Sequence, residues 1–143
     1  MNIRKCEKTD LQACASLLVE VYSEPPYNER WSLSNAEAYL ERFWNIEPER
    51  CLVAENNGRI EGVLFGFSYP WQKRINFYIQ EIFVRKGARR QDIGYSLIRH
   101  ATKDLGLDVS ISLVANEATE AAAFYQKLGL SQHRHYKFYT GIR

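Results

Sequence analysis

The sequence predicts an α/β protein with a mixed, mostly antiparallel sheet flanked by helices, organised around one central strand-loop-helix unit. Three observations predict this fold class. The apolar stretch 76–84 is typical of a buried strand, and a basic turn and an amphipathic helix follow it. The hairpin signal Asn57-Gly58 separates two further strand-like runs. Two helix-like segments precede them, and no repeat or linker interrupts the chain, so residues 1–143 are expected to form one domain.

The first 50 residues predict one strand and two helices. Residues 2–6 are expected to form the strand, and Thr9 with Gln12 gives a capping box in front of an amphipathic stretch. Two consecutive prolines end that first helix, because proline cannot continue it. Ser34 with Glu37 then predicts the start of the second helix.

The middle of the chain predicts a hairpin in front of the central strand. Its strands are expected at 51–55 and 60–67. Gly62 and Gly66 lie inside the second one, which indicates a bulge or a close backbone contact. Residues 68–74 are expected to form a loop.

The last third of the chain predicts a strand, a helix and closing strands. The strand is expected at 109–114, and Asn116 opens a helix with apolar residues spaced by three and four. Gly129 stands where a left-handed helix cap belongs. Residues 131–142 alternate enough to predict one or two closing strands.

Composition narrows the classes of partner. Of the residues, 45% are hydrophobic and 13% aromatic, which is typical of a globular protein. A net charge of +2 gives no global basic field, so no nucleic-acid partner is expected, although the local basic cluster at 85–90 leaves that class as a distant alternative. No apolar run approaches the about 18 residues of a membrane span. We therefore expect no membrane partner and a cytoplasmic location.

The cysteines and histidines indicate neither disulfides nor a metal. The three cysteines are widely spaced and include no Cys-x-x-Cys pair, so buried reduced thiols are the expected state. The three histidines, His100, His133 and His135, show no spacing typical of a metal site. We expect no bound metal.

The loop of the central unit is suited to a phosphate group. Ile93 and Leu97 begin the apolar face of the helix that follows the central strand. A helix start presents free N–H groups and the positive end of the helix dipole. Arg89 and Arg90 add positive charge, and Gly94 lets a ligand approach the first turn.

Two stretches carry a family resemblance. The run from Arg89 to Gly94 resembles the Arg/Gln-x-x-Gly-x-Gly/Ala pyrophosphate loop of the GNAT superfamily of acetyl-CoA-dependent N-acyltransferases, with Asp92 standing where the family usually has glycine. The stretch from Asn116 to Leu130 is similar to the family's Asn-x-x-Ala…Phe-Tyr-x-Lys-Leu-Gly-Phe segment. The order of predicted elements is also that of the GNAT fold, so the resemblance covers the whole chain.

The resemblance implies that acetyl-CoA is the acetyl donor. Backbone N–H groups near the end of the central strand would face the acetyl carbonyl if that strand splays from its neighbour. Asn116 has a second interpretation as a plain helix cap. The residues implied to bind the cofactor are Ile82, Phe83, Val84, Arg89, Arg90, Gln91, Asp92, Ile93, Gly94, Tyr95, Asn116 and Phe124.

Two residues are candidates for acid and base catalysis. Tyr125 is the candidate acid, because a phenol with a pKa of about 10 can protonate a departing thiolate and the matching tyrosine often has this role in the family. Its alternative is a packed core aromatic. Glu81 is expected to share one face of the central strand with Ile79 and Phe83, where desolvation raises a carboxyl pKa toward that of a general base. Its alternative is a structural glutamate paired with an arginine.

The acceptor is expected to approach the segment between the first two helices. Tyr27, Glu29 and Trp31 offer ring faces and a carboxylate to a cation, and the alternative is an ordinary surface loop. The leading hypothesis is an N-acetyltransferase acting on a small-molecule amine, aminoglycoside-like or polyamine-like. A protein N-terminus or lysine as acceptor, and a non-catalytic acyl-CoA-binding module, are the alternatives. The oligomeric state, including a homodimer, stays open.

Overall fold

A five-stranded sheet in the order β1-β2-β3-β4-β5 forms the centre of the computed structural model, which describes residues 1–89, 91–116 and 119–143. Consecutive strands pair antiparallel, except that β4 and β5 run parallel. The predicted mixed, mostly antiparallel sheet is therefore confirmed. The strands are β1 (Asn2–Lys5), β2 (Cys51–Asn56), β3 (Arg59–Trp71), β4 (Arg74–Val84) and β5 (Val109–Leu113).

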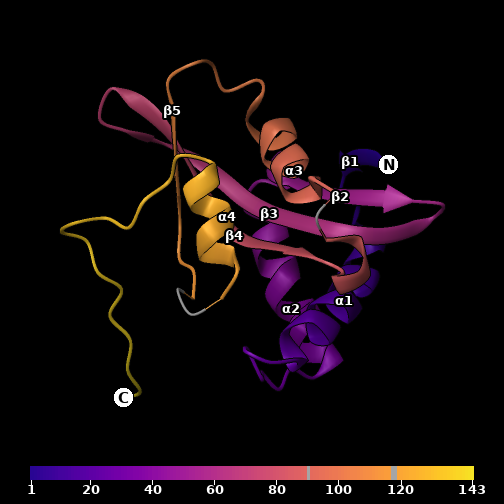
Figure 1. The fold of residues 1–143 in the computed structure, drawn as a ribbon. Helices are drawn as coiled ribbons and strands as arrows, with labels where there is room; N and C mark the ends of the chain where they lie inside the picture. Colours follow the sequence, from indigo (N-terminus) through magenta and orange to yellow (C-terminus); the bar gives the residue numbers. More distant parts are fainter. Residues whose placement is uncertain (90, 117–118) are drawn as a thin grey trace.

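Helices cover both faces of this sheet (Figure 1). One core cluster joins α1 and α2 to one face, and another joins α3 and residues of α4 to the opposite face. Fully buried Phe65 lies in the first cluster and Phe77 in the second. The two layers therefore enclose the central strands. The helices are α1 (Leu11–Ser23), α2 (Leu33–Trp44), α3 (Ile93–Thr102) and α4 (Ala121–Lys127), with 3₁₀ turns η1 (Lys8–Asp10), η2 (Pro48–Arg50) and η3 (Lys86–Ala88).

The two glycines of β3 confirm the expected close contacts. A Cβ at Gly62 would stand 2.7 Å from Cγ2 of Ile93, so this position lets α3 lie directly on the sheet. A Cβ at Gly66 would stand 2.6 Å from the ring of Phe77. The hairpin at Asn57-Gly58 is also confirmed, because β2 and β3 pair antiparallel on either side of it.

A bulge in β4 changes which residues share a face. Phe65 pairs with Glu81 and the next residue of β3 pairs with Ile79, so Gln80 is the extra residue of the ladder. Beyond the bulge the alternation is shifted by one. Phe83 packs in the cluster of α1 and α2, whereas Ile79 packs in the cluster of α3. The expectation that Glu81 shares a face with both of them was therefore wrong.

Three predicted helix starts were also wrong. Thr9 lies in η1, and α1 begins at Leu11 without a side-chain cap. The N-cap of α2 is Ser32, whose side chain accepts a hydrogen bond from the N–H of Asn35 at 3.1 Å. Ser34, the predicted cap, lies inside the helix. The last helix begins at Ala121 and not at Asn116. A Ser, Thr or Asn at several nearby positions can cap a helix, and packing decides between them.

The predicted loop and closing strands differ from the structure as well. Residues 68–74 mostly extend β3 and β4, which are joined by a turn at 72–73. Residues 131–143 form neither helix nor strand, and Tyr136, Phe138 and Tyr139 are 71%, 72% and 89% exposed. Within the described part of the chain β5 is the last strand of the sheet, and this segment does not pair with its outer edge.

The burial of the cysteine thiols agrees with the expectation from the sequence. Cys6, Cys14 and Cys51 are buried and free. Among the residues that the structure describes, no helix is both long and apolar enough to cross a membrane.

Candidate active site

The parallel pair of strands opens where the site lies. The β4–β5 ladder ends at Ile79 and Leu113. Beyond this point β4 continues to Val84 and pairs only with β3. The edge of β4 from Gln80 onward therefore presents backbone N–H and C=O groups that β5 leaves unpaired. An extended ligand could pair with this free edge as an added strand.

A cavity of about 310 Å³ lies at this opening. It brings together all five residues proposed from the sequence as catalytic or acceptor-binding: Tyr27, Glu29, Trp31, Glu81 and Tyr125. Among the residues that the structure describes, the charged lining side chains are the carboxylates of Glu29 and Glu81. The described lining residues are Tyr22, Tyr27, Glu29, Trp31, Tyr39, Ile79, Gln80, Glu81, Ile82, Leu113, Val114, Ala115, Asn116, Ala121 and Tyr125.

Burial shapes the acidity of Glu81. Desolvation raises the pKa of its carboxyl from 4.5 to about 7, and the charge of Glu29 acts in the same direction. The nearby hydroxyls of Tyr22 and Tyr39 favour the charged carboxylate and partly oppose this rise in pKa. The carboxyl therefore changes its protonation state close to neutral pH, which is the range suited to a general base.

Tyr125 reaches the cavity from α4. Burial raises the pKa of its phenol above the ordinary value of 10, and the neighbouring Tyr27 and Glu81 raise it further. The phenol therefore stays protonated throughout the physiological range. Its ring lies 5.3 Å from that of Phe124, which packs against the cluster of α3. This packing gives the hydroxyl a defined position.

The predicted acceptor residues form part of an aromatic lining. The Trp31 indole N–H donates to Oε1 of Glu29 at 2.8 Å, and the same ring lies 5.1 Å from that of Tyr39. Tyr22 and Tyr27 meet edge to face at 4.8 Å. Ring faces and carboxylates together provide the surroundings that stabilise an organic cation.

Three lining residues were missed by sequence reasoning. Tyr22 was assigned to the apolar face of the first helix, and no role was proposed for Tyr39 or Gln80. Gln80 donates from Nε2 to the hydroxyl of Tyr39 at 2.9 Å, because the bulge turns its side chain toward α2. A signal for the tyrosines was present, since both are hydroxyl-bearing rings on amphipathic helices that flank the proposed acceptor segment.

The proposed pyrophosphate loop lies at the start of α3. Arg89 is exposed and donates from Nε to the carbonyl of Val84 at 3.3 Å. Arg90 lies outside the described residues. Asp92 precedes the helix in the left-handed conformation with φ 57°, and its side chain makes no cap hydrogen bond. The Asp92 carboxylate therefore does not cap this helix.

The other proposed cofactor residues are distributed around the opening. Ile82 and Asn116 line the cavity. Ile93 is buried and Tyr95 is exposed. Phe124 occupies the space beside Gly94, where a Cβ would stand 3.0 Å from its ring. Gly94 thus makes room for a side chain of α4 as well as for the close approach that a ligand would need.

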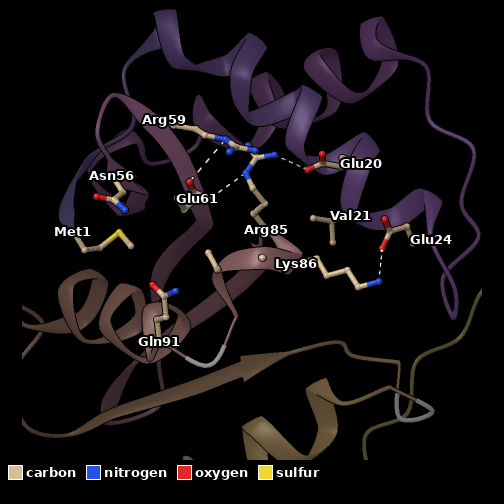
Figure 2. A pocket seen from close by; sticks show the side chains of 12 residues that line it. Met1, Glu20, Val21, Glu24, Asn56, Arg59, Glu61, Arg85, Lys86 and Gln91 are labelled. Atoms are coloured by element: carbon tan, nitrogen blue, oxygen red, sulfur yellow. Dashed lines mark hydrogen bonds and ion pairs between the residues drawn. The ribbon is translucent and has the colours of Figure 1, made fainter.

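The side chain of Gln91 does not line the cavity that holds Glu81. It lines a second cavity between α1, β3 and the segment after β4, separate from the cavity that holds Glu81 (Figure 2). Its backbone still belongs to the loop before α3. Within the described ranges, no group of three His, Cys, Asp or Glu side chains is arranged to hold a metal ion.

The fold places an unpaired strand edge near a helix start, with the carboxyl of Glu81 and the phenol of Tyr125 in one cavity beside it. A family model described as the acetyltransferase (GNAT) domain matches residues 47–130. The chain belongs to this family of acetyltransferases.

Individual relatives agree with this assignment. N-alpha-acetyltransferase 30 of Dictyostelium discoideum is 30% identical over 107 residues, which are 68% of this chain. The chain spans about half the length of this relative, since the aligned part is 55% of it. An integron cassette protein from the mobile metagenome of V. cholerae has the same fold, with a TM-score of 0.76, 20% identity, and coverage of 99% of this chain and 92% of that one.

A structure of an aminoglycoside acetyltransferase from an uncultured soil metagenomic sample also shares the fold. Its TM-score is 0.66 at 19% identity, covering 99% of this chain and 96% of that chain. The relatives therefore include enzymes named for small-molecule and for protein acceptors, so the acceptor has to be argued from the site.

Proposed function

We propose that the chain transfers the acetyl group of acetyl-CoA to a primary amine of a small cationic molecule, polyamine-like or aminoglycoside-like. The observation that carries this proposal is the cavity at the opening of β4 and β5. It combines a carboxyl with a pKa of about 7, a phenol, and an aromatic lining with a second carboxylate. The carboxylates of Glu29 and Glu81 would attract a cationic amine into the cavity, and Glu81 would also accept its proton.

The donor site follows from the open edge. Acetyl-CoA supplies the acetyl group as a thioester. The unpaired β4 edge beyond Ile79 would pair with the pantetheine arm, and backbone N–H groups there would stabilise the oxyanion. The first turn of α3 and Arg89 would hold the pyrophosphate. These residues fit the donor, apart from Asp92, whose negative charge lies beside the same helix start.

Each proton has an assigned residue. Glu81 accepts the proton of the bound ammonium, because an alkyl amine with a pKa of about 10 is almost fully protonated at neutral pH and cannot attack until it is neutral. Attack of the neutral nitrogen on the carbonyl carbon forms a tetrahedral adduct. When its C–S bond breaks, Tyr125 gives a proton to the departing sulfur, and the second proton that the nitrogen loses restores the phenol. Burial keeps that phenol protonated until it is needed.

Thiol release from acetyl-CoA in the presence of an amine panel tests the proposal. The panel contains a linear polyamine, an aminoglycoside and a short peptide with a free N-terminus, and mass spectrometry identifies each product. We expect the polyamine or the aminoglycoside to be the best acceptor. A faster reaction with the peptide would favour the second candidate, a protein N-terminal acetyltransferase, which the 30% identical relative supports. Binding of acetyl-CoA without transfer to any amine would indicate a non-catalytic module.

A further inference from the structure

The short turn η3 lies between the end of β4 and the start of α3, and it is attached to the body of the protein on both sides. The carbonyl of Arg85 accepts a hydrogen bond from the N–H of Ala88 at 2.9 Å and so closes the turn. Ala88 is 7% exposed and packs in the same core cluster as Ile93, the first residue of α3. Arg89 follows directly, and its N–H donates to the carbonyl of Lys86 at 3.4 Å. The conformation of η3 therefore determines where Arg89 lies.

Arg85, the residue before η3, donates hydrogen bonds to β3 and α1 from its backbone and from its side chain. Its N–H donates to the carbonyl of Glu61 at 2.8 Å, and its Nε donates to Oε2 of the same residue at 3.0 Å. One Nη donates to the carbonyl of Ile60 at 3.0 Å, and the other donates to Oε2 of Glu20 at 2.6 Å. The side chain is 20% exposed. A planar guanidinium binds several acceptors in fixed directions, so it holds this residue more firmly than the point charge of a lysine could.

The guanidinium of Arg85 is directed toward β3 and α1. Figure 2 shows it beside Glu61 and Glu20, whereas Gln91, from the loop before α3, lies apart from these groups. The two carboxylates lie 3.0 and 2.6 Å from its nitrogen atoms, so they neutralise its positive charge locally. Arg85 therefore affects the start of α3 through the position of η3 and not as a charge offered to a ligand.

We propose that Arg85 is a positioning residue for the donor site: it fixes η3 on β3 and α1 and thereby places Arg89 and the first turn of α3 for the pyrophosphate of acetyl-CoA. The inference rests on the proposed function, in which these groups hold the pyrophosphate. A turn that is fixed before the ligand arrives avoids the entropy cost of ordering it on binding. A loosened turn should therefore weaken the binding of a donor that carries the pyrophosphate and leave a donor that lacks it unaffected.

Two ligands and one conservative variant test this selectivity. Arg85→Lys keeps the positive charge and removes the guanidinium fork. We expect acetyl-CoA to bind this variant about tenfold more weakly in calorimetric titration, since a misplacement of about 1 Å can cost up to about two decades. S-Acetylpantetheine has no pyrophosphate, and its affinity, measured by NMR titration at millimolar concentration, should stay unchanged. Equal losses for the two ligands, or no loss for acetyl-CoA, would overturn the proposal.

Glu61→Gln separates positioning from a direct charge effect. The variant keeps the shape of the side chain and replaces a charge-assisted hydrogen bond to Arg85 by a weaker neutral one. Removal of a negative charge acting through space would tighten the binding of anionic acetyl-CoA, whereas a looser Arg85 weakens it. We expect weaker binding, by a smaller factor than in Arg85→Lys. Tighter or unchanged binding would contradict the positioning role.

Hydrogen exchange in the protein without ligand tests the turn itself. Because the N–H of Ala88 donates to the carbonyl of Arg85, Arg85→Lys should accelerate the exchange of this amide by about tenfold. The amide of fully buried Leu97 in α3 should exchange at its natural rate. An unchanged rate at Ala88 would also overturn the proposal.

Arg74→Lys is the matched control. It makes the same substitution at the other end of β4, where Arg74 pairs with Asp108 at 3.4 Å, and should alter neither the two affinities nor the exchange of Ala88. A protein that shows the expected losses of affinity but acetylates no amine would refute the proposed function and support this inference. An active enzyme whose Arg85→Lys variant binds acetyl-CoA as tightly as the natural protein would refute this inference alone.

Discussion

Replacing Glu81 by glutamine should stabilise the folded protein above neutral pH and have little effect at pH 5. Burial raises the pKa of this carboxyl from 4.5 to about 7. Between these two values the folded state holds a proton that the unfolded state has released, so stability falls as the pH rises through this window. One pKa unit corresponds to about 1.4 kcal/mol, so a rise from 4.5 to about 7 sets an upper limit of about 3.5 kcal/mol on the full loss above pH 7. Glutamine carries no charge and avoids this loss.

Urea unfolding of both proteins at pH 5 and pH 8 measures the effect. We expect a gain in the free energy of unfolding approaching 3 kcal/mol at pH 8, roughly, and a small part of it at pH 5. Glu29→Gln is the control, because it changes an exposed carboxylate of the same cavity and should shift stability by less than about 0.5 kcal/mol. A gain that is equal at the two pH values, or a loss at pH 8, would refute the reasoning from burial.

Three further predictions concern the proposed donor and acid. Acetyl-CoA should stabilise the fold by about 2.7 kcal/mol at a hundredfold excess over its Kd, measured as a rise in Tm; the absence of any rise at millimolar concentration would argue against a donor site. Tyr125→Phe should lower kcat by about two to four decades with little change in the KM for acetyl-CoA, and an unchanged kcat would return Tyr125 to a packing role. Asp92→Gly should tighten acetyl-CoA binding, most at low salt, and keep the fold as stable, because the carboxylate makes no cap contact and φ 57° suits glycine; weaker binding in calorimetric titration would show that Asp92 instead helps to orient the loop.

Much of the fold was predictable because its signals are local. The hairpin at Asn57-Gly58 needs only its own backbone conformation, and the apolar face of α3 appears directly in its sequence spacing. The close approach at Gly62 was also expected, since a glycine inside a strand leaves room for a neighbour. Such features do not depend on the rest of the chain.

The predictions that were wrong or missing concern features that depend on contacts between residues far apart in the sequence. The bulge at Gln80 is a matter of register between β3 and β4, so the sequence of β4 alone could not reveal which face Glu81 occupies. Tyr22 and Tyr39 enter the cavity only because α1 and α2 pack on that face. The tail at 131–143 alternates like a strand, but alternation cannot supply a partner strand.

The pH dependence of kcat/KM for the best amine, compared between the natural protein and Glu81→Gln, tests the central claim most directly. We predict that kcat/KM of the natural protein rises tenfold per pH unit below about 7 and then bends, as ionisation of a group with that pKa requires. In Glu81→Gln the bend near pH 7 should be absent and the rate at neutral pH lower by about two to four decades. The same bend at full rate in the variant would contradict the role of Glu81 as the base.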